Sequence, residues 1–348
     1  MSEGSSCAPS PGSLEHSALV RRVLRIDETV WRQVLDEYHQ RLTDDTPAGR
    51  LRALAEAWKT FSPQDAPLSS GPASRCPACG GETVRPEVQR RSGETYGLCT
   101  RCGHGLLLSQ AASTAIYGRP DYYSQQTAGG VGYDAYQREK DYREAKAARV
   151  LAWIEETVGA AAGRCLLEVG SGFGYTRVAA EQRGWRSMGV DLNPHAAAAA
   201  RESYGFDTIT GTLEEALSSG AIPRRHYDLV LYQFVLEHIA DPVRELKHAA
   251  AAVAPGGYVA LLVPSMQAVE RIVFGASYRS FRPDHLHLFS WASLDCCLAA
   301  AGWVRVTGAS ECSVHLLAGF LPRHEIEEIY RRGDGPDLLA VAQISEDL

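Results

Sequence analysis

Four cysteines of this 348-residue chain form two closely spaced pairs, and thiolates in such pairs are metal ligands. Cys76 and Cys79 form the first Cys-x-x-Cys pair, Cys99 and Cys102 form the second, and a glycine follows each pair directly. Each pair predicts a tight knuckle that presents two thiolates to one cation, and the segment between them suits a hairpin. We expect one structural zinc ion, because four protein ligands leave no position open for catalysis. Two unrelated thiol pairs and an iron–sulfur site are the alternatives.

A second group of residues indicates a nucleotide-type ligand. Residues 165–169, apolar except for Glu168, lead into three glycines at alternate positions, 170, 172 and 174. This pattern predicts a buried strand that turns into a helix and exposes backbone N–H groups. Glu168 stands just before the turn, where its charge disfavours phosphates and suits a cationic ligand. Asp191 comes 21 residues after Gly170, at the end of a second predicted strand, where it can accept both hydroxyls of a ribose.

Three histidines are candidates for acid–base or binding chemistry. His238 follows the fourth predicted strand, and histidine is a reasonable general base at neutral pH. An equally weighted alternative is that His238 only forms hydrogen bonds with substrate or backbone. His285 and His287 are two residues apart, so an extended segment would place them on one face. Metal ligation by this pair is a weak alternative, because no third ligand lies nearby.

An alternating α/β chain is needed to position these residues. The predicted strands are residues 165–169, 187–190, 206–210, 227–232, 258–264, 303–309 and 313–320. The predicted helices include residues 145–158, 177–183, 196–203 and 242–253. The carboxyl ends of parallel strands meet at one edge of such a sheet, so ligands bind there.

With these residues the chain resembles the class I S-adenosylmethionine-dependent methyltransferases, whose first motif is an acidic strand end followed by a glycine turn. The resemblance covers residues 166–320. It implies a Rossmann-like α/β fold with a seven-stranded sheet whose last strand is antiparallel, and it implies S-adenosyl-L-methionine as methyl donor. The donor-binding residues that it implies are Glu168, Gly170, Ser171, Gly172, Gly174, Asp191, Leu192, Thr212, Leu213, Gln233 and Phe234. The family often has an acidic residue where this chain has Thr212, so backbone or hydroxyl contacts must serve there.

The resemblance implies less about the residues that bind the methyl acceptor. In this family a histidine-containing segment between the fifth and sixth strands often lines the acceptor pocket. We therefore favour substrate binding or base catalysis for at least one of His285 and His287, beside His238. Methyl transfer from a sulfonium requires alignment of an unprotonated nucleophile and exclusion of water, with one base where the acceptor carries a proton.

A tyrosine- and glycine-rich stretch precedes the donor motif. Tyr133 and Tyr136, among glycines, are expected to form a lid over the donor, with simple packing as an even alternative. For Tyr117, Tyr122 and Tyr142 we expect packing between the two folded units.

The chain divides into five predicted segments. Residues 1–70 comprise a disordered start, a helical cap and a linker, residues 71–110 a zinc ribbon, and residues 111–160 the lid and a connecting helix. Residues 161–322 form the methyltransferase domain, and the charged tail at 323–348 has no readable role. The N-terminal helices are also a candidate homodimer contact. The order of ribbon and methyltransferase is similar to that of bacterial methyltransferases of sugars and other small metabolites.

The composition of the chain disfavours some classes of binding partner. The net charge of −7 and the pI near 5.9 disfavour nucleic acid. No apolar run reaches the roughly 18 residues of a membrane span. Nine cysteines, an odd number, suit a reducing compartment, so a soluble cytoplasmic protein is expected.

Three functions remain open. The first is methylation of a small-molecule acceptor in secondary metabolism, such as a sugar, a nucleotide-sugar or a natural-product intermediate, at oxygen, nitrogen or carbon. The second is an RNA or protein methyltransferase whose ribbon binds the polymer. The third is a donor-binding scaffold without turnover.

Overall fold

The computed structural model describes residue 24 and residues 27–61, 75–82, 84–90, 93–109, 114–124, 132–133, 136–311 and 316–345. The predicted disordered start, the linker at 62–74 and the lid glycines at 129–130 lie outside these residues. Within the described chain, no helix is both long and apolar enough to cross a membrane.

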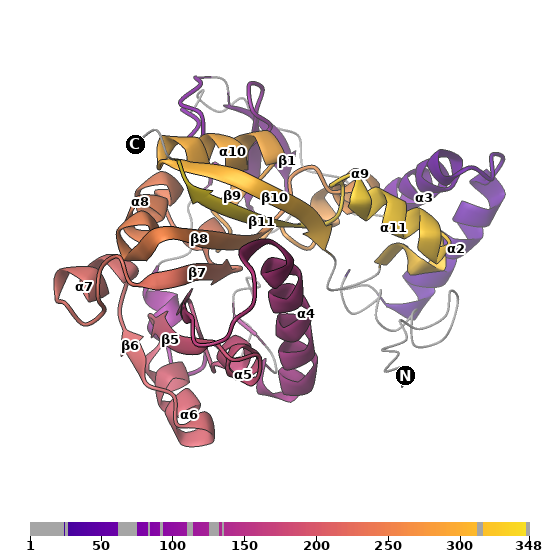
Figure 1. Cartoon of the computed structure of the whole chain (residues 1–348). Coiled ribbons are helices and arrows are strands. Elements are labelled where there is room, and N and C mark those ends of the chain that lie inside the picture. Colours follow the sequence, from indigo (N-terminus) through magenta and orange to yellow (C-terminus); the bar gives the residue numbers. More distant parts are fainter. Residues whose placement is uncertain are drawn as a thin grey trace.

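A seven-stranded sheet forms the centre of the molecule (Figure 1). Its strands are β4 (Cys165–Val169), β5 (Arg186–Asp191), β6 (Thr208–Thr210), β7 (Tyr227–Gln233), β8 (Val253–Pro264), β10 (Trp303–Glu311) and β11 (Asp337–Ile344). They lie in the order β10-β11-β8-β7-β4-β5-β6, and β11 is antiparallel to both of its neighbours while the other pairs are parallel. The predicted fold class is confirmed.

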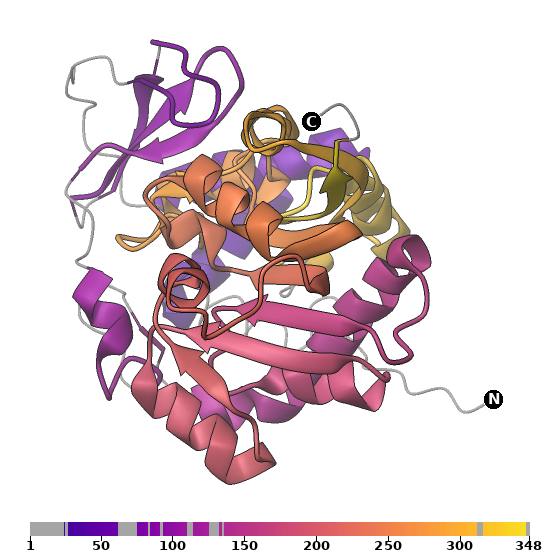
Figure 2. The same cartoon turned by 60° about the vertical axis from the view of Figure 1, so that its left-hand side comes forward.

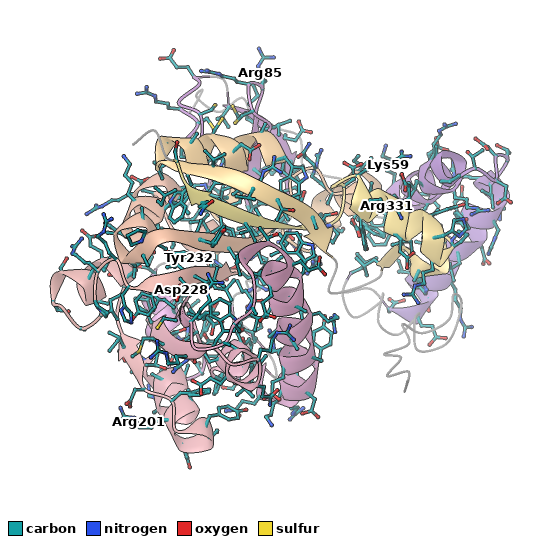
Figure 3. The ribbon with its side chains drawn as sticks, in the orientation of Figure 1. Lys59, Arg85, Arg201, Asp228, Tyr232 and Arg331 are labelled. Carbon is teal, nitrogen blue, oxygen red and sulfur yellow. The ribbon has the colours of Figure 1, made fainter. Side chains whose placement is uncertain are left out.

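Helices cover both faces of the sheet because the strands are apolar on both sides. The elements concerned are α4 (Lys140–Val158), α5 (Tyr175–Gln182), α6 (Pro194–Tyr204), α7 (Leu213–Ser218), α8 (Pro242–Ala252) and α10 (Trp291–Ala300). Leu229 and Leu231 belong to the core beneath α4 and α5. Val230 and Tyr232 belong to the opposite core beneath α7, α8 and α10, as alternation along β7 requires. Figure 3 labels Tyr232 on this central strand.

The reversed strand is β11 at residues 337–344, and the predicted strand at 313–320 is wrong for its described residues, 316–320. Leu316–Gly319 form the 3-10 helix η5, and residues 312–315 lie outside the described chain. The segment predicted to be a tail supplies α11 (Arg323–Arg331) and then β11, whose residues 338–342 are completely or almost completely buried. Leu316 and Leu317 are apolar for another reason: they pack against the N-terminal helices.

The N-terminal helices share a second core with later parts of the same chain. Helices α2 (Glu28–Arg41) and α3 (Pro47–Phe61) pack with α9 (Val269–Phe274), η5 and α11, beside the sheet in Figure 1. Trp31 and Tyr38 contact Phe320 edge to face, and the Trp58 indole donates to the Phe274 carbonyl over 3.1 Å. The apolar faces of the predicted cap are thus used within the chain, and a homodimer through these helices stays a prediction.

The cysteine pairs lie in turns beside a small separate sheet, and Cys99 is the last residue of one of its strands (Figure 2). Its strands are β1 (Val84–Gln89), β2 (Thr95–Cys99) and β3 (Gly105–Leu107), joined by β9 (His287–Leu288) from the methyltransferase sequence. The pairing of Gly105 with Leu288 therefore ties the small sheet to the segment that carries His285 and His287. The Ser290 hydroxyl adds a hydrogen bond to the Cys102 carbonyl.

Candidate functional site

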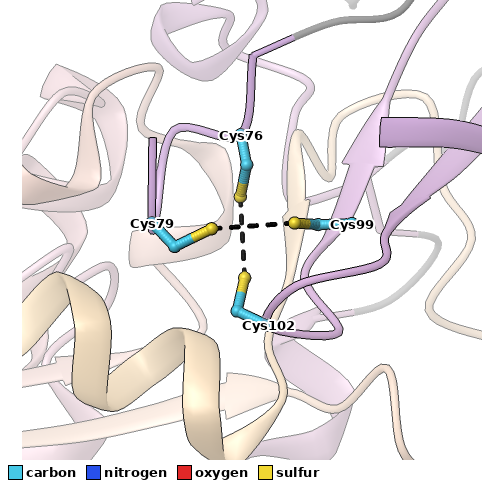
Figure 4. Close-up of side chains that lie close together, drawn as sticks. All are labelled: Cys76, Cys79, Cys99 and Cys102. Atoms are coloured by element: carbon cyan, nitrogen blue, oxygen red, sulfur yellow. Dashed lines mark hydrogen bonds between the residues drawn. The ribbon is translucent and has the colours of Figure 1, made fainter. Parts of the chain in front are cut away.

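The four predicted metal ligands converge on one point (Figure 4). Two sulfur–sulfur distances, Cys76 to Cys102 and Cys79 to Cys99, are 3.7 Å, and none of the four cysteines is in a disulfide. A regular tetrahedron with zinc–sulfur bonds of about 2.3 Å has edges of about 3.8 Å. The donor set and its spacing therefore fit tetrahedral zinc.

A cavity of about 1860 Å³ opens at the carboxyl ends of the parallel strands. Nine of the predicted donor residues line it, namely Glu168, Gly170, Ser171, Asp191, Leu192, Thr212, Leu213, Gln233 and Phe234. Gly172 and Gly174 do not line it, but their φ angles of +50° and +80° shape the turn. The backbone also needs glycine at position 170, where a Cβ would lie 2.3 Å from the Val235 side chain.

Asp191 holds the glycine turn in place. Its two carboxylate oxygens accept the backbone N–H of Gly172 over 2.6 Å and of Asn193 over 2.7 Å. Each oxygen keeps a further lone pair, and the residue lines the cavity. The carboxylate can therefore accept ribose hydroxyls while it orders the turn beneath them.

Glu168 is a buried acid in the half of the cavity beside the glycine turn, which we call the donor half after its expected ligand. Burial raises the pKa of Glu168 to about 8, against the lowering effect of a Thr176 hydrogen bond, and its Oε2 has no hydrogen-bond partner in the described chain. Burial also raises the pKa of Asp191. A cationic ligand would offset the cost of burying these charges, so the site fits a sulfonium-bearing donor.

Aromatic side chains close the donor half. Tyr133 and Tyr136 line the cavity as predicted, and the Arg143 guanidinium lies 3.6 Å from the Tyr136 ring centroid. Tyr123, which the sequence did not single out, contacts both tyrosines and also lines the cavity. Whether these rings act as a lid stays a prediction. Exposed Tyr142 also reaches the cavity wall.

The half of the cavity around His238, which we call the acceptor half after its expected role, brings together groups that lie far apart in the sequence. Glu237 and His238, in the 3-10 helix η3 (Leu236–His238) after β7, lie next to His285, and their ligand atoms are within 4.8 Å of one another. His238 Nδ1 donates to the Asp284 carbonyl over 2.6 Å, and the Tyr117 hydroxyl lies 3.1 Å from the same nitrogen. Tyr117 was expected only to pack the folded units of the chain together, but its hydroxyl also contacts a site histidine. Burial lowers the pKa of His238, so the imidazole is neutral at pH 7.

His287 lies elsewhere, so the prediction that it shares a face with His285 is wrong. Only His287 and Leu288 are extended, whereas His285 lies in the turn before them. His287 is outside the cavity lining, where its Nε2 donates to the Ile239 carbonyl and its Nδ1 lies 3.0 Å from His104. Burial lowers the pKa of His287 to about 4. The residue connects the small sheet to the loop after β7.

Glu237 is the site residue that sequence reasoning missed. Its side chain is completely buried, lines the cavity, and receives no hydrogen bond from another residue of the described chain. Burial raises the pKa of Glu237 well above its usual value. The available signal was its position beside His238 at the end of a buried strand.

Comparison with known proteins agrees with this geometry. Residues 136–307 match the family described as the methyltransferase domain. The ubiquinone biosynthesis O-methyltransferase of Leptothrix cholodnii is 34% identical over 119 residues, which cover 32% of this chain and 48% of that protein. That of Bordetella avium is 33% identical over 112 residues, covering 31% and 46%. The chain spans about half the length of the curated relatives that it matches.

Solved structures are similar at low identity. A chain of the complex between the Haloferax volcanii Trm112 methyltransferase activator and a putative methyltransferase aligns with a TM-score of 0.47 and 18% identity, over 60% of this chain and 95% of its own. An S-adenosylmethionine-dependent methyltransferase from Archaeoglobus fulgidus gives 0.45 and 20%, over 60% and 98%.

The strand order with its reversed strand, the glycine turn and the acidic strand ends are those of a class I methyltransferase. The family match covers the same region. Residues 136–307 therefore form a class I S-adenosylmethionine-dependent methyltransferase domain.

Proposed function

We propose that the protein transfers a methyl group from S-adenosyl-L-methionine to a small-molecule acceptor. The observation that carries this proposal is one continuous cavity whose lining includes both the donor residues Glu168 and Asp191 and the acceptor-side residues Glu237, His238 and His285. The donor supplies the methyl group on a sulfonium, and the chain aligns an acceptor with it and keeps water out.

The acceptor-side histidines are suited to deprotonation. His238 and His285 each use Nδ1 in a hydrogen bond to a backbone carbonyl, which fixes the ring and leaves Nε2 as a proton acceptor. In this proposal one of the two takes the proton of the acceptor nucleophile. His287 has no such part, because it lies outside the cavity.

A hydroxyl acceptor is favoured over an amine or a carbon acid. The curated relatives carry the name ubiquinone biosynthesis O-methyltransferase, which supports an oxygen nucleophile, although they match only part of this chain. Sugars and phenols are the first acceptors to test.

Zinc bound by the four cysteines is part of the proposal as a structural ion. The alternative function is methylation of RNA or protein with the ribbon as the polymer-binding element. The placement of the small sheet favours the small molecule, because β3 pairs with β9 and Cys76 and Cys102 pack into the main core.

Transfer of tritiated methyl groups to panels of sugars, nucleotide-sugars and phenols tests the function. We expect turnover of at least one small acceptor, and a loss of about 100-fold or more in His285→Gln or His238→Gln with unchanged donor affinity. Exposed His226→Gln is the control. Salt-sensitive retention of RNA together with RNA methylation would support the alternative. Donor binding without any turnover would mark a scaffold.

A further inference from the structure

We propose that Glu237, His238 and His285 form a binding site for a divalent first-row transition-metal ion, distinct from the four-cysteine site. The inference rests on the proposed function and deepens it, because the ion would bind the acceptor and determine its chemical class.

The three side chains converge as metal ligands do. One ligand atom from each lies within 4.8 Å of the others, and His238 Nε2 is 3.9 Å from Glu237 Oε1. The two imidazole centroids are 4.9 Å apart with a 73° angle between the ring planes. All three residues line the cavity, so an ion between them would face the acceptor.

The hydrogen bonds of the two histidines fix the tautomer that metal binding requires. A carbonyl oxygen only accepts, so Nδ1 of His238 donates to Asp284 and Nδ1 of His285 donates to Ser280, over 2.6 and 2.9 Å. Each ring therefore carries its proton on Nδ1 and a lone pair on Nε2. A backbone carbonyl that holds the other ring nitrogen is the usual support of a metal-ligating histidine.

Glu237 provides the negative charge that such an ion needs. Its side chain is 0% exposed, and no other residue of the described chain donates to either carboxylate oxygen. Arg282 does not serve this purpose, since it donates to Asp284 over 3.0 and 3.2 Å. A buried carboxylate without a donor is costly unless it is neutralised or coordinates a cation, and the neighbouring imidazoles offer only lone pairs.

The donor set selects the class of metal and of acceptor. Two imidazoles and one carboxylate suit manganese, iron, cobalt or zinc better than magnesium or calcium. Three protein ligands leave coordination positions open toward the cavity, where a hydroxyl oxygen can bind. Metal coordination would lower the pKa of a bound hydroxyl, so the acceptor can lose its proton to bulk water as it binds. In this refinement of the proposed function the metal ion replaces the histidine base, and the two histidines serve as its ligands. The oxygen then forms the new O–CH3 bond as the S–CH3 bond breaks with its electron pair on sulfur, giving a methyl ether and the thioether product.

Cobalt(II) titration of the zinc-loaded full-length chain tests the site. We expect calorimetry to show one cobalt ion bound per chain in addition to the cysteine-bound metal. The absorption should show d–d bands without thiolate-to-cobalt charge transfer, because nitrogen and oxygen ligate the ion. In Glu237→Gln and His285→Gln the affinity of this ion should fall by at least about 100-fold, because each substitution removes one of three ligands.

Glu270→Gln is the matched control, since Glu270 is another buried glutamate with a free carboxylate oxygen but lies outside the cavity lining. It should keep the second metal, and thermal unfolding identifies any variant that fails to fold. Binding of the cysteine-site metal alone, or equal cobalt affinity in wild type and Glu237→Gln, would overturn the inference. Donor affinity is measured on the same samples: intact donor binding without a second metal refutes this site only, whereas no donor binding refutes the proposed function.

Discussion

The donor and acceptor halves of the cavity are built in opposite ways. Glu168, the glycine turn and Asp191 lie within one stretch of two dozen residues, where two adjacent parallel strands end side by side. The acceptor half combines Tyr117, Glu237, His238 and His285, which come from three separate segments. Local sequence thus specifies the donor site, whereas tertiary contacts assemble the acceptor site.

The small sheet belongs to the acceptor half of this comparison. Through β9 and the Ser290 bond it holds the segment that carries His285. Substitutions that disrupt the zinc ribbon should therefore destabilise the acceptor half more than the donor half.

Cys102→Ser should have the largest effect. We expect loss of the bound zinc, which in small zinc domains contributes about 10–16 kcal/mol of binding free energy, and therefore a strongly lowered melting temperature. Metal analysis should return about one zinc per chain fewer for the variant than for wild type. Hydrogen exchange should rise at residues 282–289 before it rises at 165–191. Cys296→Ser, a neighbouring cysteine outside the cluster, is the control. Equal exchange in both regions would contradict the division.

Asp191→Ala should break the donor half alone. Hydrogen bonds to charged groups contribute about 1.5–3 kcal/mol each, so loss of the ribose and turn contacts should weaken donor binding by about 100-fold. Calorimetry measures this change, with exposed Asp207→Ala as the control. Cobalt binding at the acceptor side should persist. Unchanged donor affinity would refute the assignment of Asp191.

The pH dependence of donor binding should sharpen the role of Glu168. Because its pKa is raised to about 8 in the ligand-free protein, a cationic donor must displace a proton below that pH. Donor affinity should rise by up to about tenfold per pH unit between pH 6 and 8, and Glu168→Gln should remove this dependence.

The same raised pKa means that the folded state holds this proton up to a higher pH than the unfolded state does. The contribution of Glu168 to folding stability therefore falls as pH rises from about 4.5 to 8. Proton release measured by calorimetry in two buffers checks the sign.

Tyr117→Phe should have the smallest effect. The His238 ring keeps its bond to the Asp284 carbonyl, so removal of a neutral hydroxyl should cost about 1 kcal/mol or less. We expect turnover to fall a few-fold with donor affinity unchanged, and Tyr258→Phe, outside the cavity lining, to behave as wild type. A loss as large as that of His238→Gln would make Tyr117 a catalytic group.

The sequence predicted the sites whose residues lie close together in the chain, but few of the sites that distant segments assemble. The cysteine pairs, the glycine turn and most donor residues were predictable because spacing alone determines their geometry. Glu237 was missed because its importance depends on a histidine 48 residues later in the chain. The reversed strand was misplaced because two apolar segments followed β10, and only tertiary packing decides that Leu316 and Leu317 join α2 and α3 while residues 338–342 enter the sheet.

Strand β11 lies between β8 and β10, yet it follows both in the chain. Until residues 337–344 are in place, β10 therefore has no partner in this sheet and β8 exposes one hydrogen-bonding edge. A chain without that segment would leave one edge of β8 and both edges of β10 unpaired. Completion of this side of the sheet therefore requires residues 337–344 to insert between two strands that precede them in the chain.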